Sequence, residues 1–342
     1  MRDDGPAMIS PTAPEPVTTP LPTVSVIMPV LDEERHLGAA VRQVLDQDWA
    51  GAMEVILALG PSRDGTQAVA DALAASDPRV TLVANPSGRT PDALNAAIAG
   101  SSGEIVVRVD GHAEIPTDYV SRAVGALEAT GADNVGGTMD AQGETPFERA
   151  VACAMRSPIG VGSSRFHTGG DAGAVDTVYL GAFRRSALER VGGYDSRFTR
   201  AQDWELNHRI RATGGTVWFT PDLRVTYRPR ATVRALARQY FQYGQWRRAV
   251  VRTHPETVNA RYLAAPAMVT GTTLATAIGV VWKPALALPA GYAVAVAVGG
   301  LAITRGEPVA TRLLAGPVLA TMHWCWGIGF LSSRIRLPMA TR

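Results

Sequence analysis

An apolar run ends in an Asp, a Gly and a His in the segment EIVVRVDGHAEIP, residues 104–116. Side chains two residues apart in an extended chain point to the same side, so we expect Asp110 and His112 to share a direction where the strand stops. A carboxylate and an imidazole placed together could bind a divalent metal ion. The alternative is that both residues only cap the next turn, since Asp-Gly is a common turn dipeptide.

Composition narrows the class of protein. The chain of 342 residues is long enough for one large domain and a further region. Its 33 Lys and Arg against 31 Asp and Glu give a formal net charge of +2, and no block of like charge indicates a nucleic-acid partner. Cys153 and Cys325 are far apart and lack metal-ligand spacing, so we expect neither a disulfide framework nor a zinc knuckle.

The two ends of the chain differ in character. Residues 1–23 are rich in proline and lack an apolar core segment, which predicts a disordered cytosolic leader. Residues 251–342 contain three apolar stretches, each close to the ~20 residues that cross a bilayer. They are 263–282, 285–303 and 313–331. We therefore predict a membrane region with two or three apolar helices.

Residues 24–250 alternate between short apolar runs and helix-like segments. The runs 24–30, 54–59, 80–85 and 104–110 are typical of buried parallel strands. A helical segment follows each of the first three runs. The first ends near Asp48, and the others cover 65–76 and 90–100. In the third segment, Thr90 is the expected N-cap and Pro91 the first helical residue. The pattern predicts a doubly wound α/β sheet.

Ligands of such sheets bind beyond the carboxyl ends of the strands. The first predicted strand leads into Asp32, Glu33 and Glu34, and the fourth into Asp110 and His112. Neither a P-loop nor a dinucleotide-binding fingerprint follows any strand. Acidic side chains would repel a phosphate ligand unless a cation lay between them, and Mg²⁺ or Mn²⁺ suits this set of ligands.

Six motifs in sequence order carry a resemblance to a known family. They are VSVIMPVLDEERHL, EVILALGPSRDGT, GRTPDALNAAIAGSSGEIVVRVDGH, VYLGAFRRSALERVGGYDSRF, AQDWELNHRIRATGG and QYGQWRR. Together they resemble the family 2 glycosyltransferases of the GT-A fold, in particular the membrane-associated glycosyltransferases of the succinoglycan type. The resemblance covers residues 24–248 and extends to the apolar C-terminal stretches. It implies a GT-A-like mixed sheet and transfer of a sugar, with inversion, from a nucleotide-sugar donor to an acceptor hydroxyl.

The resemblance also implies roles for individual residues. Asp110 and His112 match the family's metal-binding motif, and Asp203 stands where the family has its catalytic Asp. The other positions that match are the nucleotide-sugar-binding residues Pro29, Asp32, Glu34, Asp64, Arg89, Asn95 and Asp110, and the acceptor and diphosphate region with Gly181, Gln242, Trp246 and Arg247. Four positions depart from the family pattern: Asp32 replaces Asn, Leu59 replaces a base-binding Asp, Gln202 replaces Glu and Gln245 replaces Arg.

Several of these assignments have structural alternatives. Asp203 is expected to take the acceptor proton as general base, but QDWELNHRIR could also begin a helix for which it is the N-cap. Asp64 could contact the nucleotide base in place of Leu59 or cap a helix. Gly181 would let a substrate approach the backbone closely or form a strand kink. Arg247 and Arg248 could hold the diphosphate or form a membrane-facing basic edge.

The histidines outside the metal motif show no ligand spacing. We expect His208 to lie on a helix surface and His167 to sit in a glycine-rich loop that could form a flap over the site. His323 would lie within the third apolar stretch, where a polar residue indicates function.

Nucleotide sugars are cytosolic, which places the catalytic domain on the cytoplasmic side of the inner or plasma membrane. The arginines before the first apolar stretch agree with this orientation. Three spans would place Arg334, Arg336 and Arg342 outside, whereas two spans and an interfacial helix would keep them inside. A catalytic rim beside membrane helices indicates a lipid-linked saccharide as acceptor and addition of a single sugar.

We therefore predict a metal-dependent inverting glycosyltransferase, with a UDP-sugar as the favoured donor. Leu59 weighs against uracil, because it cannot accept a hydrogen bond from the imide. The main alternative is a non-catalytic membrane scaffold or nucleotide-sugar-binding protein of a polysaccharide assembly. A nucleotidyltransferase is a second alternative, but it would need a basic, glycine-rich loop where this chain has PVLDEERHL.

Overall fold

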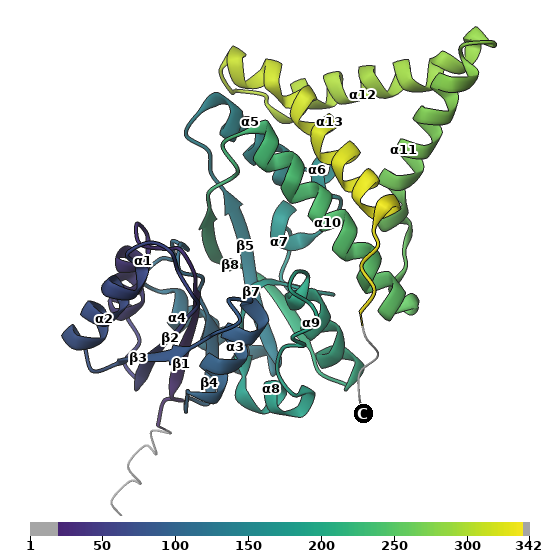
Figure 1. The fold of residues 1–342 in the computed structure, drawn as a ribbon. Coiled ribbons are helices and arrows are strands. Elements are labelled where there is room, and N and C mark those ends of the chain that lie inside the picture. Colours follow the sequence, from purple (N-terminus) through teal and green to yellow (C-terminus); the bar gives the residue numbers. More distant parts are fainter. Residues whose placement is uncertain (1–19, 338–342) are drawn as a thin grey trace, which may run out of the picture.

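The computed structural model describes residues 20–337. It consists of a layered α/β domain and a group of long C-terminal helices that lie against one end of it (Figure 1). Most of the predicted leader, residues 1–19, and Arg342 in the tail lie outside the described residues.

One mixed sheet of eight strands forms the centre of the α/β domain, in the order β3-β2-β1-β4-β7-β5-β8-β6. The four predicted strands are parallel neighbours: β1 (Val24–Val30), β2 (Met53–Leu59), β3 (Val80–Ala84) and β4 (Ile105–Arg108). Next to β4 lies β7 (Tyr179–Arg184), antiparallel to both β4 and β5 (Asn134–Ala141). The other edge contains β8 (Val217–Tyr227) and the short β6 (Gly173–Ala174). The predicted doubly wound mixed sheet is therefore confirmed.

Helices cover both faces of the sheet because successive strand side chains alternate between two apolar cores. Val26 and Val107 pack with buried residues of α1 (Leu37–Leu45) and α4 (Tyr119–Thr130). Ile27 and Val106 pack on the opposite face, with Leu94 of α3 (Thr90–Ala99) and with α8 (Arg185–Val191) and α9 (Gln202–Ala212). Helix α2 (Thr66–Ser76) lies beside α1. Both faces of the central strands are buried, which explains their continuous apolar runs.

The predicted start of α3 is one residue late. Arg89 has an extended backbone and is the N-cap, so the helix begins at Thr90 and Pro91 is its second residue. No side-chain cap bond forms here, and the Arg89 guanidinium instead pairs with Asp92 in the first turn.

The C-terminal helices begin with α10 (Val233–Thr253), which is followed by the short 3-10 helix η1 (Pro255–Thr257). Helix α13 (Val309–Ser332) packs along α10 at two glycines. A Cβ added at Gly244 would lie 2.0 Å from the carbonyl oxygen of Trp326, and one at Gly329 would lie 2.1 Å from that of Phe241. The two backbones therefore approach each other as closely as only glycine allows. Helix α13 also contacts α5 (Pro146–Met155).

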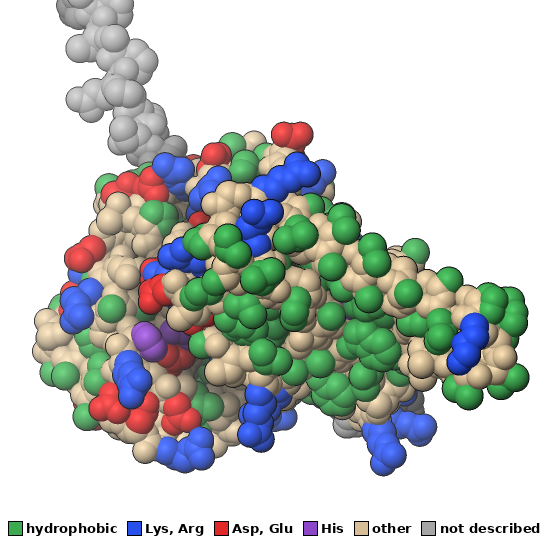
Figure 2. All heavy atoms as spheres, turned by 90° about the horizontal axis from the view of Figure 1, so that it is seen from above, with side chains coloured by type: hydrophobic (Ala, Val, Ile, Leu, Met, Phe, Trp, Pro, Cys, Tyr) green, Lys and Arg blue, Asp and Glu red, His purple; other side chains and the backbone are tan. Residues whose placement is uncertain are grey.

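The predicted apolar stretches form α11 (Ala260–Ile278), the segment made of η2 (Lys283–Leu286) and α12 (Ala287–Ile303), and α13. Among the described residues, Lys283–Ile303 and Val309–Ser332 are long and apolar enough to cross a membrane, by length and composition. Helix α11, with Pro266 inside it, is not one of them, so two of the three stretches remain candidates. Helices α11 and α12 diverge from the rest of the molecule, and apolar side chains cover much of the arm that they form (Figures 1 and 2). Val281, in the short segment between α11 and η2, is 91% exposed.

Candidate active site

A cavity of about 990 Å³ lies between the carboxyl end of the sheet and the C-terminal helices. One part of its wall is polar and comes from the ends of β1 and β4 and from the first turn of α9. The other part comes from α10 to α13 and is largely apolar, with residues such as Met268, Val296 and Met322. The polar and apolar parts belong to one continuous space.

Asp110 and His112 both line the cavity, but not as an extended pair. Strand β4 ends at Arg108, and the chain turns at residues 110–113, where the Ala113 amide donates to the Asp110 carbonyl (2.9 Å). The expectation that the strand itself would align the two residues is therefore wrong. Asp110 instead accepts a hydrogen bond from Arg108 (2.8 Å to Nε), and His112 Nδ1 lies 2.7 Å from a carboxylate oxygen of Glu33.

Arg108 is a site residue that the sequence interpretation missed. Its side chain is buried, and its guanidinium forms ion pairs with both Asp110 and Asp203. A buried charge requires oppositely charged partners, so an arginine inside an otherwise apolar strand was the available signal. Arg108 thus joins the proposed metal ligand and the proposed base in one network.

Asp203 does not act as an N-cap. The N-cap of α9 is Ala201, with φ of 59° and no side-chain cap bond, and Asp203 is the second residue of the helix. Its carboxylate faces the cavity and Arg108. Burial raises the pKa of Asp203 to about 6, the ion pair with Arg108 opposes this rise, and the Asp110 charge adds to it. Asp203 is thus a carboxylate whose proton affinity is close to that of a base working near neutral pH.

Three of the predicted nucleotide-binding residues bind neighbouring loops. Asp32 accepts a hydrogen bond from the Arg63 amide (2.8 Å), and Glu34 accepts one from the Gly65 amide (3.0 Å). Asp64 accepts a hydrogen bond from the Thr66 amide at the start of α2 (3.1 Å), although the N-cap of this helix is Gly65. These bonds hold the loop after β1 against the loop after β2, beside Pro29, which does line the cavity.

Other predicted residues are not among those that line the cavity. Arg89 contacts Asp92 and the Ser196 carbonyl (3.3 Å to the latter), and Asn95 exchanges two hydrogen bonds with the backbone of Tyr194. Gly181 has φ of 106°, and a Cβ there would lie 2.7 Å from Asn134 Oδ1, so its conformation serves the interior of the sheet. Gln242 is likewise outside the cavity lining, whereas Trp246 lines it.

Arg247 lines the cavity, which excludes a membrane-facing edge for this side chain. Its guanidinium lies 4.2 Å from the ring centre of Tyr262 and 4.9 Å from that of Trp204. The Nη1 atom is buried and has no hydrogen-bond partner among residues 20–337. Burial lowers the pKa of Arg247 from its ordinary value, and Arg261 adds to this decrease. Such a cation is suited to an anionic ligand.

His167 also faces the cavity, from the short helix α7 (Arg165–Thr168) inside the predicted glycine-rich loop. Burial lowers its pKa to about 3, so the imidazole is neutral at physiological pH. His323, in α13, lines the cavity too, and its Nε2 lies 2.8 Å from the Ile159 carbonyl oxygen.

His208 is not a simple surface residue. The structure brings it next to His254 and Glu256, although the spacing of the histidines in the sequence gave no sign of this. The ring centres of His208 and His254 are 4.5 Å apart.

Comparison with known proteins gives the family. Residues 25–192 match the model of glycosyl transferase family 2. Succinoglycan biosynthesis protein ExoA of Rhizobium meliloti is 31% identical over 309 residues, which cover 89% of this chain and 93% of the relative. The chain is a family 2 glycosyltransferase. Beta-monoglucosyldiacylglycerol synthase of Synechocystis sp. is 29% identical over 206 residues, 56% of this chain and 41% of that relative.

A solved glycosyltransferase shares the fold. Mannosyltransferase PcManGT from Pyrobaculum calidifontis, in complex with GDP-Man and Mn²⁺, superposes with a TM-score of 0.59 at 24% identity, over 94% of this chain and 90% of that one. The match extends over nearly the whole chain, including the C-terminal helices. The GT-A-like architecture expected from the six motifs is thus confirmed.

Proposed function

We propose that this glycosyltransferase is an inverting, metal-dependent enzyme of polysaccharide or glycolipid synthesis, and that its acceptor is a lipid-linked saccharide. One observation carries the proposal: a single cavity contains Asp110, His112 and Asp203 at its polar end and apolar residues of α11 to α13 at its other end. The names of the Rhizobium and Synechocystis relatives, which refer to a polysaccharide and a glycolipid, support this choice of pathway class.

Asp110 and His112 fit a divalent cation. The Asp110 carboxylate supplies oxygen atoms, and Glu33 engages Nδ1 of His112 and leaves Nε2 for a metal. A carboxylate that orients a histidine through its other ring nitrogen is a common feature of metal sites. Mn²⁺ or Mg²⁺ held here would neutralise the charge of the departing nucleoside diphosphate. The Mn²⁺ and GDP-Man bound to the Pyrobaculum enzyme are consistent with such a site.

The donor is a nucleotide sugar. A UDP-sugar is our first candidate, although Leu59, at the end of β2, cannot accept a hydrogen bond from a uracil imide. A donor with another base would remove this difficulty, so the panel tested below includes several bases.

Asp203 is the proposed general base. An inverting displacement needs a base that removes the acceptor proton on the face opposite the leaving group, a role commonly worth about 10²- to 10⁴-fold in rate. With a pKa of about 6, Asp203 is mostly ionised near neutral pH. Arg108 contacts both Asp203 and Asp110 and so fixes the base relative to the donor site.

The acceptor side of the cavity suits a lipid phosphate. Arg247 offers a buried Nη1 that has no hydrogen-bond partner in the described part of the chain, and Arg261 also lines the cavity. A buried cation without an ion-pair partner is costly, and a phosphate or diphosphate would satisfy it through charge-assisted hydrogen bonds. The adjoining apolar wall would accommodate the first part of a hydrocarbon chain.

The membrane arrangement follows from the same features. Lys283–Ile303 and Val309–Ser332 serve as the proposed spans, with the catalytic domain facing the cytoplasm, where nucleotide sugars occur. A multi-pass arrangement with an even number of spans also keeps Arg334 and Arg336 on the cytoplasmic side, as the positive-inside rule favours.

Calorimetry on the full-length protein in detergent tests the proposal, using UDP-, GDP- and dTDP-sugars with and without Mn²⁺. We expect metal-dependent binding of one donor, lost in Asp110→Ala and in His112→Ala. Transfer is then measured with that donor to a lipid-linked saccharide and to the same saccharide without its lipid. If none of the donors binds, the non-catalytic scaffold alternative is favoured. Equal transfer to both acceptors would contradict the proposal that the acceptor is lipid-linked.

A further inference from the structure

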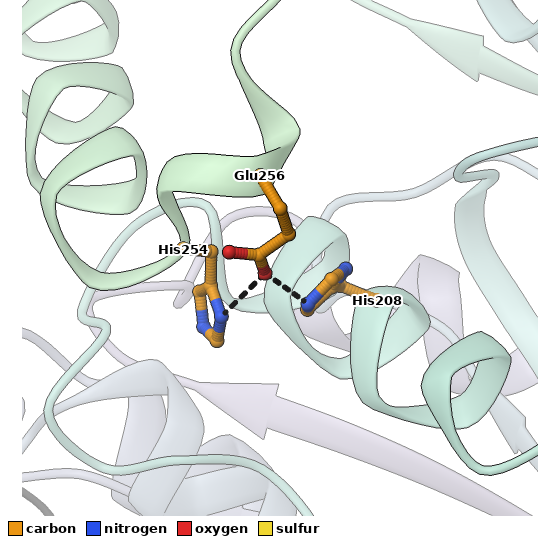
Figure 3. A group of neighbouring side chains, drawn as sticks. All are labelled: His208, His254 and Glu256. Carbon is orange, nitrogen blue, oxygen red and sulfur yellow. Dashed lines mark ion pairs between the residues drawn. The ribbon is translucent and has the colours of Figure 1, made fainter.

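Three side chains meet outside the cavity, at the junction between the catalytic domain and the C-terminal helices (Figure 3). His208 extends from α9, His254 is the C-cap of α10, and Glu256 lies in η1. Their closest ligand atoms lie within 4.8 Å of one another. None of the three lines the large cavity, so they are separate from the donor site.

We propose that His208, His254 and Glu256 form a zinc-binding site that fastens helix α9 to the corner between α10 and η1. Two imidazoles and a carboxylate are a ligand set that proteins use for Zn²⁺, with a water molecule in the fourth position. This set differs from the oxygen-rich sites that Mg²⁺ prefers.

The distances agree with one tetrahedral ion. Ligand bonds of about 2.0–2.1 Å place neighbouring ligand atoms of a tetrahedron about 3.3 Å apart. In the structure, Oε1 of Glu256 lies 3.1 Å from Nε2 of His208 and 3.5 Å from Nδ1 of His254. These two separations lie on either side of the tetrahedral value, and the ligand nitrogens of the two histidines lie within 4.8 Å of each other. Binding of one ion would bring all three ligand atoms to the tetrahedral separation.

Further side chains surround the two imidazoles. Glu205 is 2% exposed, and its carboxylate lies 3.9 Å from Nε2 of His254, the ring nitrogen that does not face Glu256. Arg209 holds Glu205 through two contacts of 2.6 Å. At this distance the two groups are not hydrogen-bonded, but a small movement that closed the gap would let Glu205 orient the imidazole, as carboxylates do for many metal-bound histidines. The ring of His208 stacks on Trp204, with an interplanar angle of 5°.

The position of the site gives it a role in the geometry of the cavity. His208 belongs to the same helix as Asp203, and Trp204 contacts both His208 and the cavity. His254 and Glu256 follow the helix that carries Arg247. A zinc ion would therefore hold the proposed base and the proposed acceptor-binding arginine at a fixed separation, without touching the substrates.

The test uses Co²⁺ as a spectroscopic probe for zinc, with full-length protein in detergent and no nucleotide. All proteins carry His112→Ala, so that the donor metal site does not contribute to the signal. We expect one equivalent of Co²⁺ to bind with the visible absorption of a tetrahedral ion, and Zn²⁺ to displace it. His254→Ala and Glu256→Gln should each weaken binding by at least about tenfold. The exposed His36, changed to Ala, is the matched control and should bind like the parent.

Thermal unfolding provides a second measurement. Zn²⁺ should raise the Tm of the parent and of His36→Ala but much less that of Glu256→Gln, because a ligand that binds only the folded state stabilises it by an amount that grows with the logarithm of the ligand concentration divided by its Kd. Glu256 is 60% exposed at its side chain, so the Gln variant should remain folded. Failure of the folded parent to bind Co²⁺, or unchanged binding in both ligand variants, would overturn the proposal and leave the cluster as an ion pair only. Both outcomes are independent of donor binding and transfer.

Discussion

Replacing Arg108 with Gln tests whether this arginine controls the ionisation of Asp203. The substitution removes the positive charge that Asp203 and Asp110 share and keeps a hydrogen-bonding side chain of intermediate length. Arg108 lowers the pKa of Asp203, so its loss should move that pKa upward from about 6. A base that must be ionised then works only at higher pH, and the rising limb of the pH profile should shift in the alkaline direction.

The size of the shift can be bounded. Opposite charges ~4 Å apart attract by about 4 kcal/mol at an effective dielectric constant of ~20. If about one third of this attraction energy remains after relaxation and water entry, removing Arg108 costs the ionised form of Asp203 about 1.4 kcal/mol, which corresponds to roughly one pKa unit. The fraction of ionised Asp203 at about pH 7 then falls from about nine tenths to about one half, and the full interaction would reduce it to about one hundredth.

The assay is kcat/KM against pH for the parent and Arg108→Gln, since this quantity reports the ionisation of the free enzyme. Arg184→Gln is the matched control, because Arg184 donates to the carbonyls of Leu127 and Ala132 and pairs with no carboxylate among residues 20–337. The Arg108 variant should regain activity at alkaline pH. A rate that is lower at every pH with an unchanged midpoint would refute the reasoning.

Stability must be measured in parallel. Breaking a buried ion pair by removing one partner commonly costs about 3–5 kcal/mol. Arg108→Gln should therefore have a lower Tm than the parent, and the kinetics belong at a temperature where it is fully folded.

Three further predictions concern the base, the acceptor site and the helix packing. Asp203→Asn should lower kcat by about 10²- to 10⁴-fold with donor Kd unchanged in calorimetry; near-normal turnover would contradict the role. Arg247→Met should raise KM for the lipid-linked acceptor and leave donor Kd unchanged, and an effect on donor Kd alone would assign Arg247 to the donor instead. Gly329→Val should destabilise the protein by at least about 1–3 kcal/mol through the α10 contact, whereas Gly291→Val, where a Cβ meets nothing within 4 Å, should not.

The sequence predicted the sheet well because its strands are buried on both faces. Continuous apolar runs and helical segments between them leave few arrangements other than a parallel sheet, and β1 to β4 follow this pattern. The six motifs then identified the family. Asp110, His112 and Asp203 were found because they belong to those motifs, and all three line the cavity.

The remaining parts of the site depend on contacts between distant segments. The pairing of Arg108 with Asp203 joins residues 95 positions apart, and His208 meets Glu256 only because η1 folds back onto α9. Local periodicity carries no information about such contacts. The prediction of where α3 begins was wrong for a different reason. Thr before Pro is typical of an N-cap, but the backbone is already helical at Thr90.

The packing of α13 has a consequence for the order in which the enzyme is made. Met322, His323 and Trp326 are the last residues, in chain order, that line the cavity, and α13 shares an apolar core with α5 and α10. A growing chain released from the ribosome up to α10 has the sheet, Asp110 and Asp203, but one wall of its cavity is still missing. Packing of α13 on α10 through the glycine contacts supplies the last part of that wall. The cavity is therefore complete only when the last apolar helix is in place.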